Sequence, residues 1–165
     1  DPSVTKEFNE QIEEISEKLK FDIFQSFRDR QITKQITKDN GKYRVLKSRN
    51  VGNNEVKELE NYDCYIDDTE NLAVAKFLNR DDVVMIPNLT YYPRASFLPK
   101  NTITDGSVAL LTLKNGSRLP TEKDLEYYGS KEFERFYRVA RNYGTRSLNI
   151  DNNSVFFFGL LKNID

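Results

Sequence analysis

Short apolar runs bounded by turn residues constrain the fold of this chain more than any other feature. The run at 107–113 (SVALLTL) lies between two glycine-containing turns, and the run at 83–86 (VVMI) is stopped by Pro87. Runs of this length and composition are typical of buried strands. A third run near the end, at 155–161 (VFFFGLL), predicts another buried strand.

An amphipathic helix is predicted at the start of the chain. Apolar residues recur there at spacings of four, three and four, at Phe8, Ile12, Ile15 and Leu19. This spacing predicts a helix over 6–26. Its apolar stripe packs either on the domain's own core, which amphipathic helices usually serve, or on a catalytic domain upstream. We therefore divide the chain into an N-terminal helix, 1–26, and a main domain, 27–165.

A pair of helices is predicted before the last strand. Thr121 and Asp124 form a capping-box-like start for a short helix that ends near Gly129. Ser130 caps a second helix, and Gly144 is placed to follow its end. The apolar face of this second helix consists of Phe133, Phe136, Tyr137 and Ala140.

Shorter elements fill the middle of the chain. The turn signal Asn40-Gly41 precedes an alternating segment, 43–47, that predicts a strand. A short helix fits 72–78, and 94–98 is strand-like. The order of helix, strands, helix pair and strand predicts a single α+β domain with a mixed or strongly bent sheet.

Composition limits the chemistry of the chain. Its 165 residues suit one domain, and they contain no histidine. Ser-His and Cys-His nucleophile pairs are therefore excluded. The one cysteine, Cys64, has no disulfide partner within the chain, and a zinc site would lack its usual ligands. None of the seven glycines stands in a phosphate-binding pattern, so no catalytic site is visible.

The ends of the chain and its hydropathy bear on its location. No stretch approaches the roughly 18 apolar residues that a membrane span needs. The first twenty residues are amphipathic and acidic, unlike a signal peptide. We expect a reducing cytoplasm and no membrane partner. The chain opens with Asp1-Pro2 and its one methionine is Met85, so we expect a domain cut from a longer protein.

Charge is segregated along the chain although the net charge is only -1. Segment 25–50 has eight Lys or Arg against two Asp, a net charge of +6. Segment 51–79 has two Lys against seven acids, a net charge of -5, and 80–146 has eleven cations against eight acids, a net charge of +3. Such segregation indicates a basic face on a neutral protein, and a lattice of salt bridges would give a similar pattern.

Two polar segments are candidates for ligand contacts. Tyr91, Tyr92 and Arg94 offer aromatic rings for stacking and a guanidinium fork for a phosphate or a base edge. The alternative is a tyrosine that anchors a hairpin, with Arg94 in a surface ion pair. Lys100 and Asn101, in the turn that follows, share both interpretations.

The second candidate segment follows the helix pair. Its hydroxyl, guanidinium and amide groups are those of Thr145, Arg146, Ser147 and Asn149. These groups suit phosphate contacts and one base contact, and the alternative is ordinary capping between two elements. Arg49 and Asn50, at the end of the basic stretch, also carry groups suited to base edges.

The order of several segments resembles a target recognition domain of a restriction-modification protein. The segments are 82–87 (DVVMIP), 93–95 (PRA), 98–100 (LPK), 108–113 (VALLTL), 125–137 (LEYYGSKEFERFY) and 144–150 (GTRSLNI). The chain is similar over 40–161 to the TaqI-like C-terminal specificity domain of N6-adenine DNA methyltransferases and to the recognition domains of type I specificity subunits. It departs from that family in a long acidic insert at 55–70.

The resemblance implies a lobe that presents loops to the major groove of duplex DNA. It also implies that a separate, upstream methyltransferase domain of the same bacterial protein binds S-adenosylmethionine and methylates adenine. This chain would then bind no cofactor or metal and hold no catalytic residue. The turn at 144–149 matches the family's exit into its last element, and Arg94 matches its mid-domain basic loop.

Two other functions are open on the residues alone. Asp39, Glu55 and Lys57 have the residue types of a small metal-dependent nuclease, in which carboxylates hold Mg²⁺ near a lysine. A protein-interaction module would instead dock a partner on the apolar stripe from Phe8 to Leu19.

Overall fold

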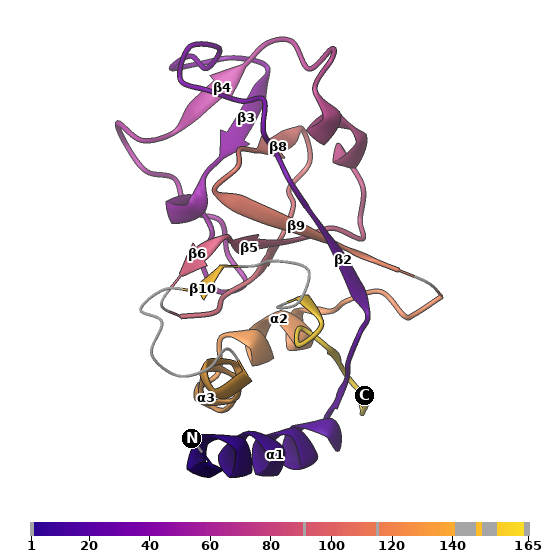
Figure 1. Cartoon of the computed structure of the whole chain (residues 1–165). Coiled ribbons are helices and arrows are strands. Elements are labelled where there is room, and N and C mark those ends of the chain that lie inside the picture. The colour runs from indigo at the N-terminus through magenta and orange to yellow at the C-terminus, as the bar shows by residue number, and fades with distance from the viewer. Residues whose placement is uncertain (1, 91, 115, 141–147, 150–154, 164–165) are drawn as a thin grey trace.

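A four-stranded antiparallel sheet forms the middle layer of the molecule (Figure 1). The structure is a computed structural model that describes residues 2–90, 92–114, 116–140, 148–149 and 155–163. In spatial order the strands are β2 (Phe24–Arg28), β9 (Val108–Leu113), β5 (Val84–Pro87) and β7 (Ser96–Phe97).

Both faces of this sheet are buried. Along β9, Ala109 and Leu111 belong to a core on the helical side, whereas Val108 and Leu110 belong to a second core on the opposite side. The same alternation divides the residues of β5 between the two cores. A strand that is apolar on both faces reads as a continuous apolar run, because successive side chains point in opposite directions. The predicted buried strands at 83–86 and 107–113 are confirmed.

Three helices cover one face of the sheet (Figure 1). They are α1 (Pro2–Ser16), α2 (Glu122–Tyr128) and α3 (Lys131–Ala140). The helix pair is confirmed, because Thr121 is the N-cap of α2 and Ser130 Oγ accepts a hydrogen bond from Phe133 N at 3.1 Å at the start of α3. Gly144, predicted to follow α3, lies outside the described residues. In the part of the chain that is described, no helix combines the length and apolar character needed to cross a membrane.

The predicted N-terminal helix over 6–26 is wrong beyond Ser16. The chain turns, forms β1 (Leu19–Lys20) and enters β2. β2 pairs with β9 from Phe24↔Leu113 to Arg28↔Ala109, and these backbone bonds and the burial of Phe24 override the helical pattern. The predicted boundary after residue 26 therefore falls inside a strand.

The apolar stripe of α1 serves the domain's own core. Ile15 and Leu19 are buried in the core on the helical side, and Ile12 packs against it. α1 lies along α3, and Lys18 Nζ bonds Glu132 Oε1 at 2.6 Å. Of the two predicted partners for this stripe, the described residues confirm the domain's own core.

A smaller, mixed sheet lies on the other side of the central sheet (Figure 1). β3 (Tyr43–Leu46) pairs antiparallel with β4 (Cys64–Ile66) and parallel with β8 (Thr102–Thr104). The 3₁₀ helix η2 (Ala73–Phe77), predicted as a short helix at 72–78, packs beside it. The protein is thus a single α+β domain with mixed sheets, as predicted.

The predicted strand at 155–161 is wrong except at its end, where β11 (Leu160–Leu161) pairs with β1. The phenylalanines before it do not alternate across a sheet. Phe158 enters the helical-side core, whereas Phe156 is 41% exposed and stacks on Phe21 with ring centroids 5.7 Å apart. Gly159 then passes so close to β1 that a Cβ would lie 2.4 Å from the Lys20 carbonyl oxygen. Aromatic packing, rather than strand pairing, fixes this segment.

Candidate nucleic-acid interface

Three segments predicted to contact a ligand lie together at one edge of the molecule (Figure 1). β6 (Leu89–Thr90) pairs with β10 (Leu148–Asn149), so Leu89 lies opposite Asn149. The loop 92–94 follows β6, and its Arg94 side chain reaches the 3₁₀ turn η1 (Ser48–Asn50) at the end of β3. We call η1, the loop 92–94 and the β6–β10 pair the η1 edge.

The η1 turn forms because Asn50 closes it from within. Asn50 Oδ1 accepts a hydrogen bond from Lys47 N at 2.9 Å, and Asn50 N donates to the Lys47 carbonyl oxygen at 2.9 Å. Such local side-chain bonds are the reason that Asn favours turns. The Asn50 side chain is fully buried. The amide that we predicted to contact DNA is therefore not exposed to a ligand in this structure.

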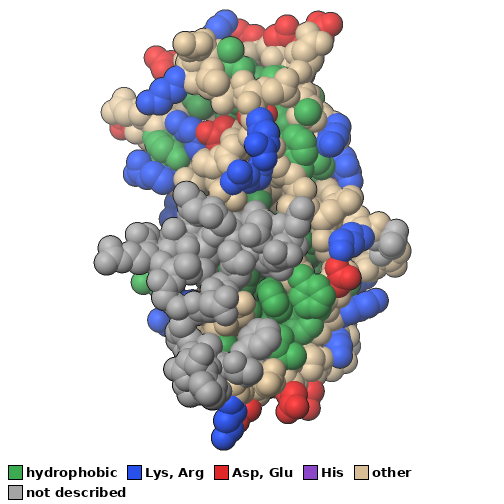
Figure 2. Space-filling view, viewed as in Figure 1, with side chains coloured by type: hydrophobic (Ala, Val, Ile, Leu, Met, Phe, Trp, Pro, Cys, Tyr) green, Lys and Arg blue, Asp and Glu red, His purple; other side chains and the backbone are tan. Residues whose placement is uncertain are grey.

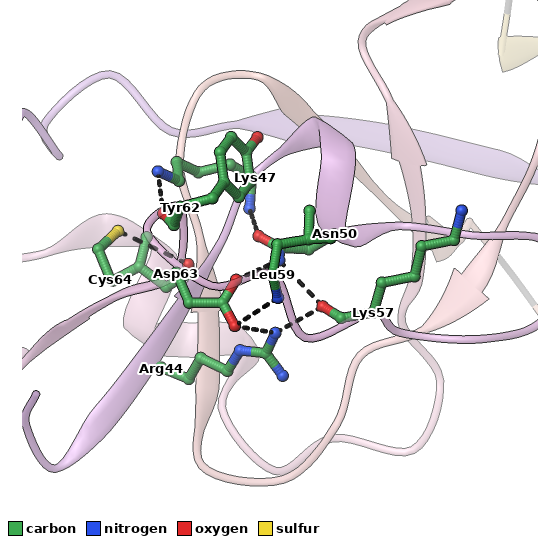
Figure 3. Close-up of polar contacts among 9 residues, drawn as sticks. Arg44, Lys47, Asn50, Lys57, Leu59, Tyr62, Asp63 and Cys64 are labelled. Atoms are coloured by element: carbon green, nitrogen blue, oxygen red, sulfur yellow. Dashed lines mark hydrogen bonds and ion pairs between the residues drawn. The ribbon is translucent and has the colours of Figure 1, made fainter. Parts of the chain in front are cut away.

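The acidic insert folds around one half-buried carboxylate, that of Asp63 (Figure 3). Asp63 accepts hydrogen bonds from Asn50 Nδ2 at 2.6 Å, from Leu59 N at 3.1 Å and from the Arg44 guanidinium at 3.0 Å. Asn50 Nδ2 and the same guanidinium also donate to the Lys57 carbonyl oxygen, at 3.0 and 2.7 Å. The side chains of Arg44 and Asp63 are only 19% and 15% exposed, so this pair is shielded from water and salt. We call these contacts the Asp63 network.

Tyr62 lies next to this network and contacts two cations, Lys47, which Figure 3 shows, and Arg49. Lys47 Nζ lies 3.9 Å from the centroid of the Tyr62 ring and donates to the Tyr62 carbonyl oxygen at 2.6 Å. The Arg49 guanidinium lies 4.8 Å from the same ring centroid, and Arg49 N donates to the tyrosine hydroxyl at 3.2 Å. A cation held over a ring keeps its charge while its side chain loses freedom. Arg49 is exposed and therefore presents a positioned guanidinium to solvent.

An open depression of about 870 Å³ lies beside Tyr62. Its lining includes Lys34, Asp39 and Lys47 together with Glu58 and other residues of the acidic insert, so it carries both signs of charge. Cys64 also lines it, and burial raises the pKa of this thiol above its ordinary value. A protonated thiol is a poor nucleophile, so the depression lacks an activated cysteine.

The loop 92–94 places an exposed ring and a half-buried cation side by side. Tyr92 is 61% exposed, and the Arg138 guanidinium of α3 lies 5.6 Å from its ring centroid. Arg94 Nε donates to the Val51 carbonyl oxygen at 2.6 Å. Burial lowers the pKa of Arg94 from its usual value, although an arginine remains charged at neutral pH. Tyr92 is thus displayed to solvent, whereas Arg94 is turned onto the protein.

Lys100 and Asn101 lie away from the η1 edge. β8 runs parallel to β3 with Arg44 opposite Thr102, so Lys100 and Asn101 lie beside the start of β3. The η1 turn follows the opposite end of β3. Both residues are exposed, and Asn101 N donates to Asn79 Oδ1 at 2.9 Å in a turn where Asn101 has φ +56°. The structure does not bring this part of the predicted site together with the rest.

Of the remaining predicted residues, most lie outside the described residues and one is placed by its backbone alone. Tyr91, Thr145, Arg146 and Ser147 lie outside the described residues. Asn149 is placed by the backbone pairing of β10, which brings it to the η1 edge.

The two carboxylates of the proposed nuclease alternative, Asp39 and Glu55, lie in different parts of the structure. Asp39 lines the depression, whereas Glu55 lies in a tight turn in which its backbone N donates to Ser96 Oγ at 2.8 Å. Over the described parts of the chain, no three His, Cys, Asp or Glu side chains are grouped so as to hold a metal ion.

Basic side chains are numerous around the smaller sheet. Figure 2 shows Lys and Arg side chains spread across the upper half of the visible face, with several acidic side chains along its top border. Arg49 and Lys47 come from the basic stretch of the sequence, and their neighbour Tyr62 comes from the acidic insert. Sequence reasoning missed Tyr62 and Lys47, because a contact between residues 13 to 15 positions apart in a loop follows no period.

Comparisons with known proteins add no family assignment. No protein-family model matches the chain, and no curated protein gives a significant match.

Proposed function

We propose that this chain is a DNA-binding domain that contacts duplex DNA through the η1 edge. In its finer form, the proposal is that the chain is the target recognition domain of an adenine-specific restriction-modification methyltransferase. Methylation and S-adenosylmethionine binding would then belong to another domain of that protein. The observation that carries the proposal is the meeting of Arg49, Tyr92 and the backbone of Asn149 at one edge, although they come from separate parts of the sequence.

The chemistry of this edge suits a polyanion with planar bases. The exposed Arg49 guanidinium offers a two-pronged donor, which fits a phosphate or the O6 and N7 atoms of guanine. The exposed Tyr92 ring offers an apolar surface with a polar tip. Both side chains lie near another group, Tyr62 in one case and Arg138 in the other, and this reduces the entropy lost on binding.

Salt-dependent binding of mixed-sequence duplex DNA is the first test. We expect the fluorescence anisotropy of labelled DNA to rise with protein, and log affinity to fall linearly with log salt, since bound cations release counterions from phosphates. Arg49→Glu is expected to weaken binding by at least about tenfold, because it replaces an attraction with a repulsion.

The matched control is Arg80→Glu, which makes the same charge change at a residue that is paired with Asp82 away from the η1 edge. An equal loss in both variants would show attraction to net charge alone, and absence of binding at low salt would refute the proposal. If binding is found, selection of sites from a random duplex library tests the finer form. An enriched sequence supports target recognition, whereas a flat outcome leaves only nonspecific binding.

A further inference from the structure

Arg94 joins two parts of the η1 edge. Its Nε donates to the Val51 carbonyl oxygen at 2.6 Å, and its guanidinium also donates to the Ser48 carbonyl oxygen at 3.3 Å. Ser48 is the first residue of η1 and Val51 is the residue that follows it, and they lie 46 and 43 residues before Arg94 in the chain. A planar guanidinium suits such bridging because its donors point in fixed, divergent directions.

Other contacts hold the same turn from other directions. Ser48 N donates to Ser107 Oγ at 2.9 Å, which ties the start of η1 to the turn before β9. The Asn50 side chain at its end is held by the Asp63 network. Between these two fixed residues stands Arg49, whose side chain is exposed. The turn is therefore anchored in such a way that one cation is directed outward.

We infer that Arg94 is a positioning residue, which fixes η1 so that Arg49 meets the DNA, rather than a residue that contacts DNA itself. The inference rests on the proposed function. A 3₁₀ turn of three residues has little stability of its own, so its geometry depends on outside contacts. Without Arg94 the Ser48 and Val51 carbonyls lose a charged donor, and Arg49 loses its fixed direction.

A double-mutant cycle in DNA affinity tests this assignment. The wild type, Arg49→Ala, Arg94→Ala and the double variant are compared by fluorescence anisotropy at one salt concentration. Each single variant is expected to bind at least about tenfold more weakly, the effect of losing one charge-assisted contact. The double variant is expected to bind no more weakly than Arg49→Ala, because Arg94 acts through Arg49.

Independent effects that multiply in the double variant would overturn the inference. A second readout is Arg94→Lys, which keeps the charge but lacks the planar guanidinium whose fixed, divergent donors reach both carbonyls. We expect it to bind as weakly as Arg94→Ala, and recovery to wild-type affinity would mean a simple charge contact with DNA instead. Arg80→Ala serves as the control for loss of one positive charge.

Hydrogen exchange separates positioning from general loss of structure. In Arg94→Ala, the amides of Asn50 and Val51 should exchange faster while those of α3 are unchanged, and Arg49→Ala should change neither. Unchanged exchange at η1 would overturn the inference. If Arg94→Ala does not fold, Arg94→Gln, which retains a neutral amide group that can donate to one of the two carbonyls, replaces it in the cycle.

The outcomes distinguish this inference from the proposed function. A wild type that does not bind DNA removes both. A wild type that binds, with multiplying effects in the cycle, removes only the positioning role of Arg94.

Discussion

The two faces of the central sheet are closed in different ways. On the helical side, buried rings of Tyr128, Phe133, Tyr137 and Phe158 pack against one another with centroids 4.9 to 5.8 Å apart. On the other side, a smaller apolar core is supplemented by the Asp63 network and by buried Asn50. Apolar packing is non-directional, whereas hydrogen bonds fix orientation.

This difference teaches where a binding surface can be built. Irregular loops carry unpaired backbone groups, and only directional bonds hold them in one conformation. The η1 turn itself lies on the side with the polar network, next to loops held by Asn50, Asp63 and Arg94. The apolar core on the helical side stabilises strands β5 and β9 from the opposite face of the sheet.

The largest effect is expected on the helical side. Phe133→Ala removes a fully buried ring that touches five other aromatic rings, so we expect the free energy of unfolding to fall by about 3–5 kcal/mol. Chemical denaturation measures this change in the free energy of unfolding. Arg135→Ala, on the exposed face of the same helix, is the control and should change it by less than about 0.5 kcal/mol. A loss for Phe133→Ala no larger than the control would show that this core is loosely packed.

A somewhat smaller effect is expected on the polar side. Asp63→Asn keeps the size of the side chain but removes the charge that faces the Arg44 guanidinium and the Leu59 amide. We expect a loss of about 2–4 kcal/mol in the free energy of unfolding, because a shielded cation is left without its anion. Asp67→Asn removes the carboxylate of an exposed pair with Lys38 and should cost under about 1 kcal/mol. Equal losses in the two variants would mean that the Asp63 network does not set the polar side apart.

The smallest expected effect depends on pH and concerns the start of α2. Burial raises the pKa of Asp124, but hydrogen bonds from Arg118, Leu161 N and Thr121 N outweigh burial, so the pKa lies below its ordinary value. A carboxyl group with a lowered folded-state pKa stabilises the fold above its unfolded pKa of about 4, and that contribution is lost as pH falls through the folded value. Asp124→Asn should therefore be less stable than wild type by about 1–3 kcal/mol at pH 7.

Urea denaturation of the wild type and Asp124→Asn between pH 2 and 7 measures this contribution. The gap between them should be constant from neutral pH to about pH 5 and should close in more acid solution. A gap that is the same at all pH values would show that the side chain acts by its shape and not by its charge.

The elements predicted correctly from the sequence are those whose pattern is local. β9 and the helix pair follow from apolar periodicity and from the capping residues Thr121 and Ser130. The end of the N-terminal helix was predicted wrongly because 19–28 continues a helical spacing yet pairs with β11 and β9, two strands that lie much later in the chain. The last strand was predicted wrongly because three consecutive phenylalanines pack in different directions.

The candidate site was predictable in its chemistry but not in its assembly. Arg49 and Tyr92 were identified from residue type, and both are exposed at the η1 edge. Asn50 and Arg94 also carry hydrogen-bond donors. The Asn50 amide, however, is buried, and the Arg94 guanidinium donates to a backbone carbonyl of the protein. Whether a guanidinium or amide points to solvent or to a carbonyl depends on neighbours that are more than 40 residues away in the case of Arg94.

Turn chemistry and side-chain periodicity act over a few residues, so the α+β class, the buried strands β5 and β9 and the capped helix pair could be predicted from the sequence. The tertiary structure alone decided that α1 ends at Ser16, that Asp63 gathers the acidic insert and that η1 meets the loop 92–94. Those outcomes depend on burial and on hydrogen bonds between distant segments. Such contacts form only when the whole chain has folded and both cores are packed, so they cannot be predicted from a local sequence pattern.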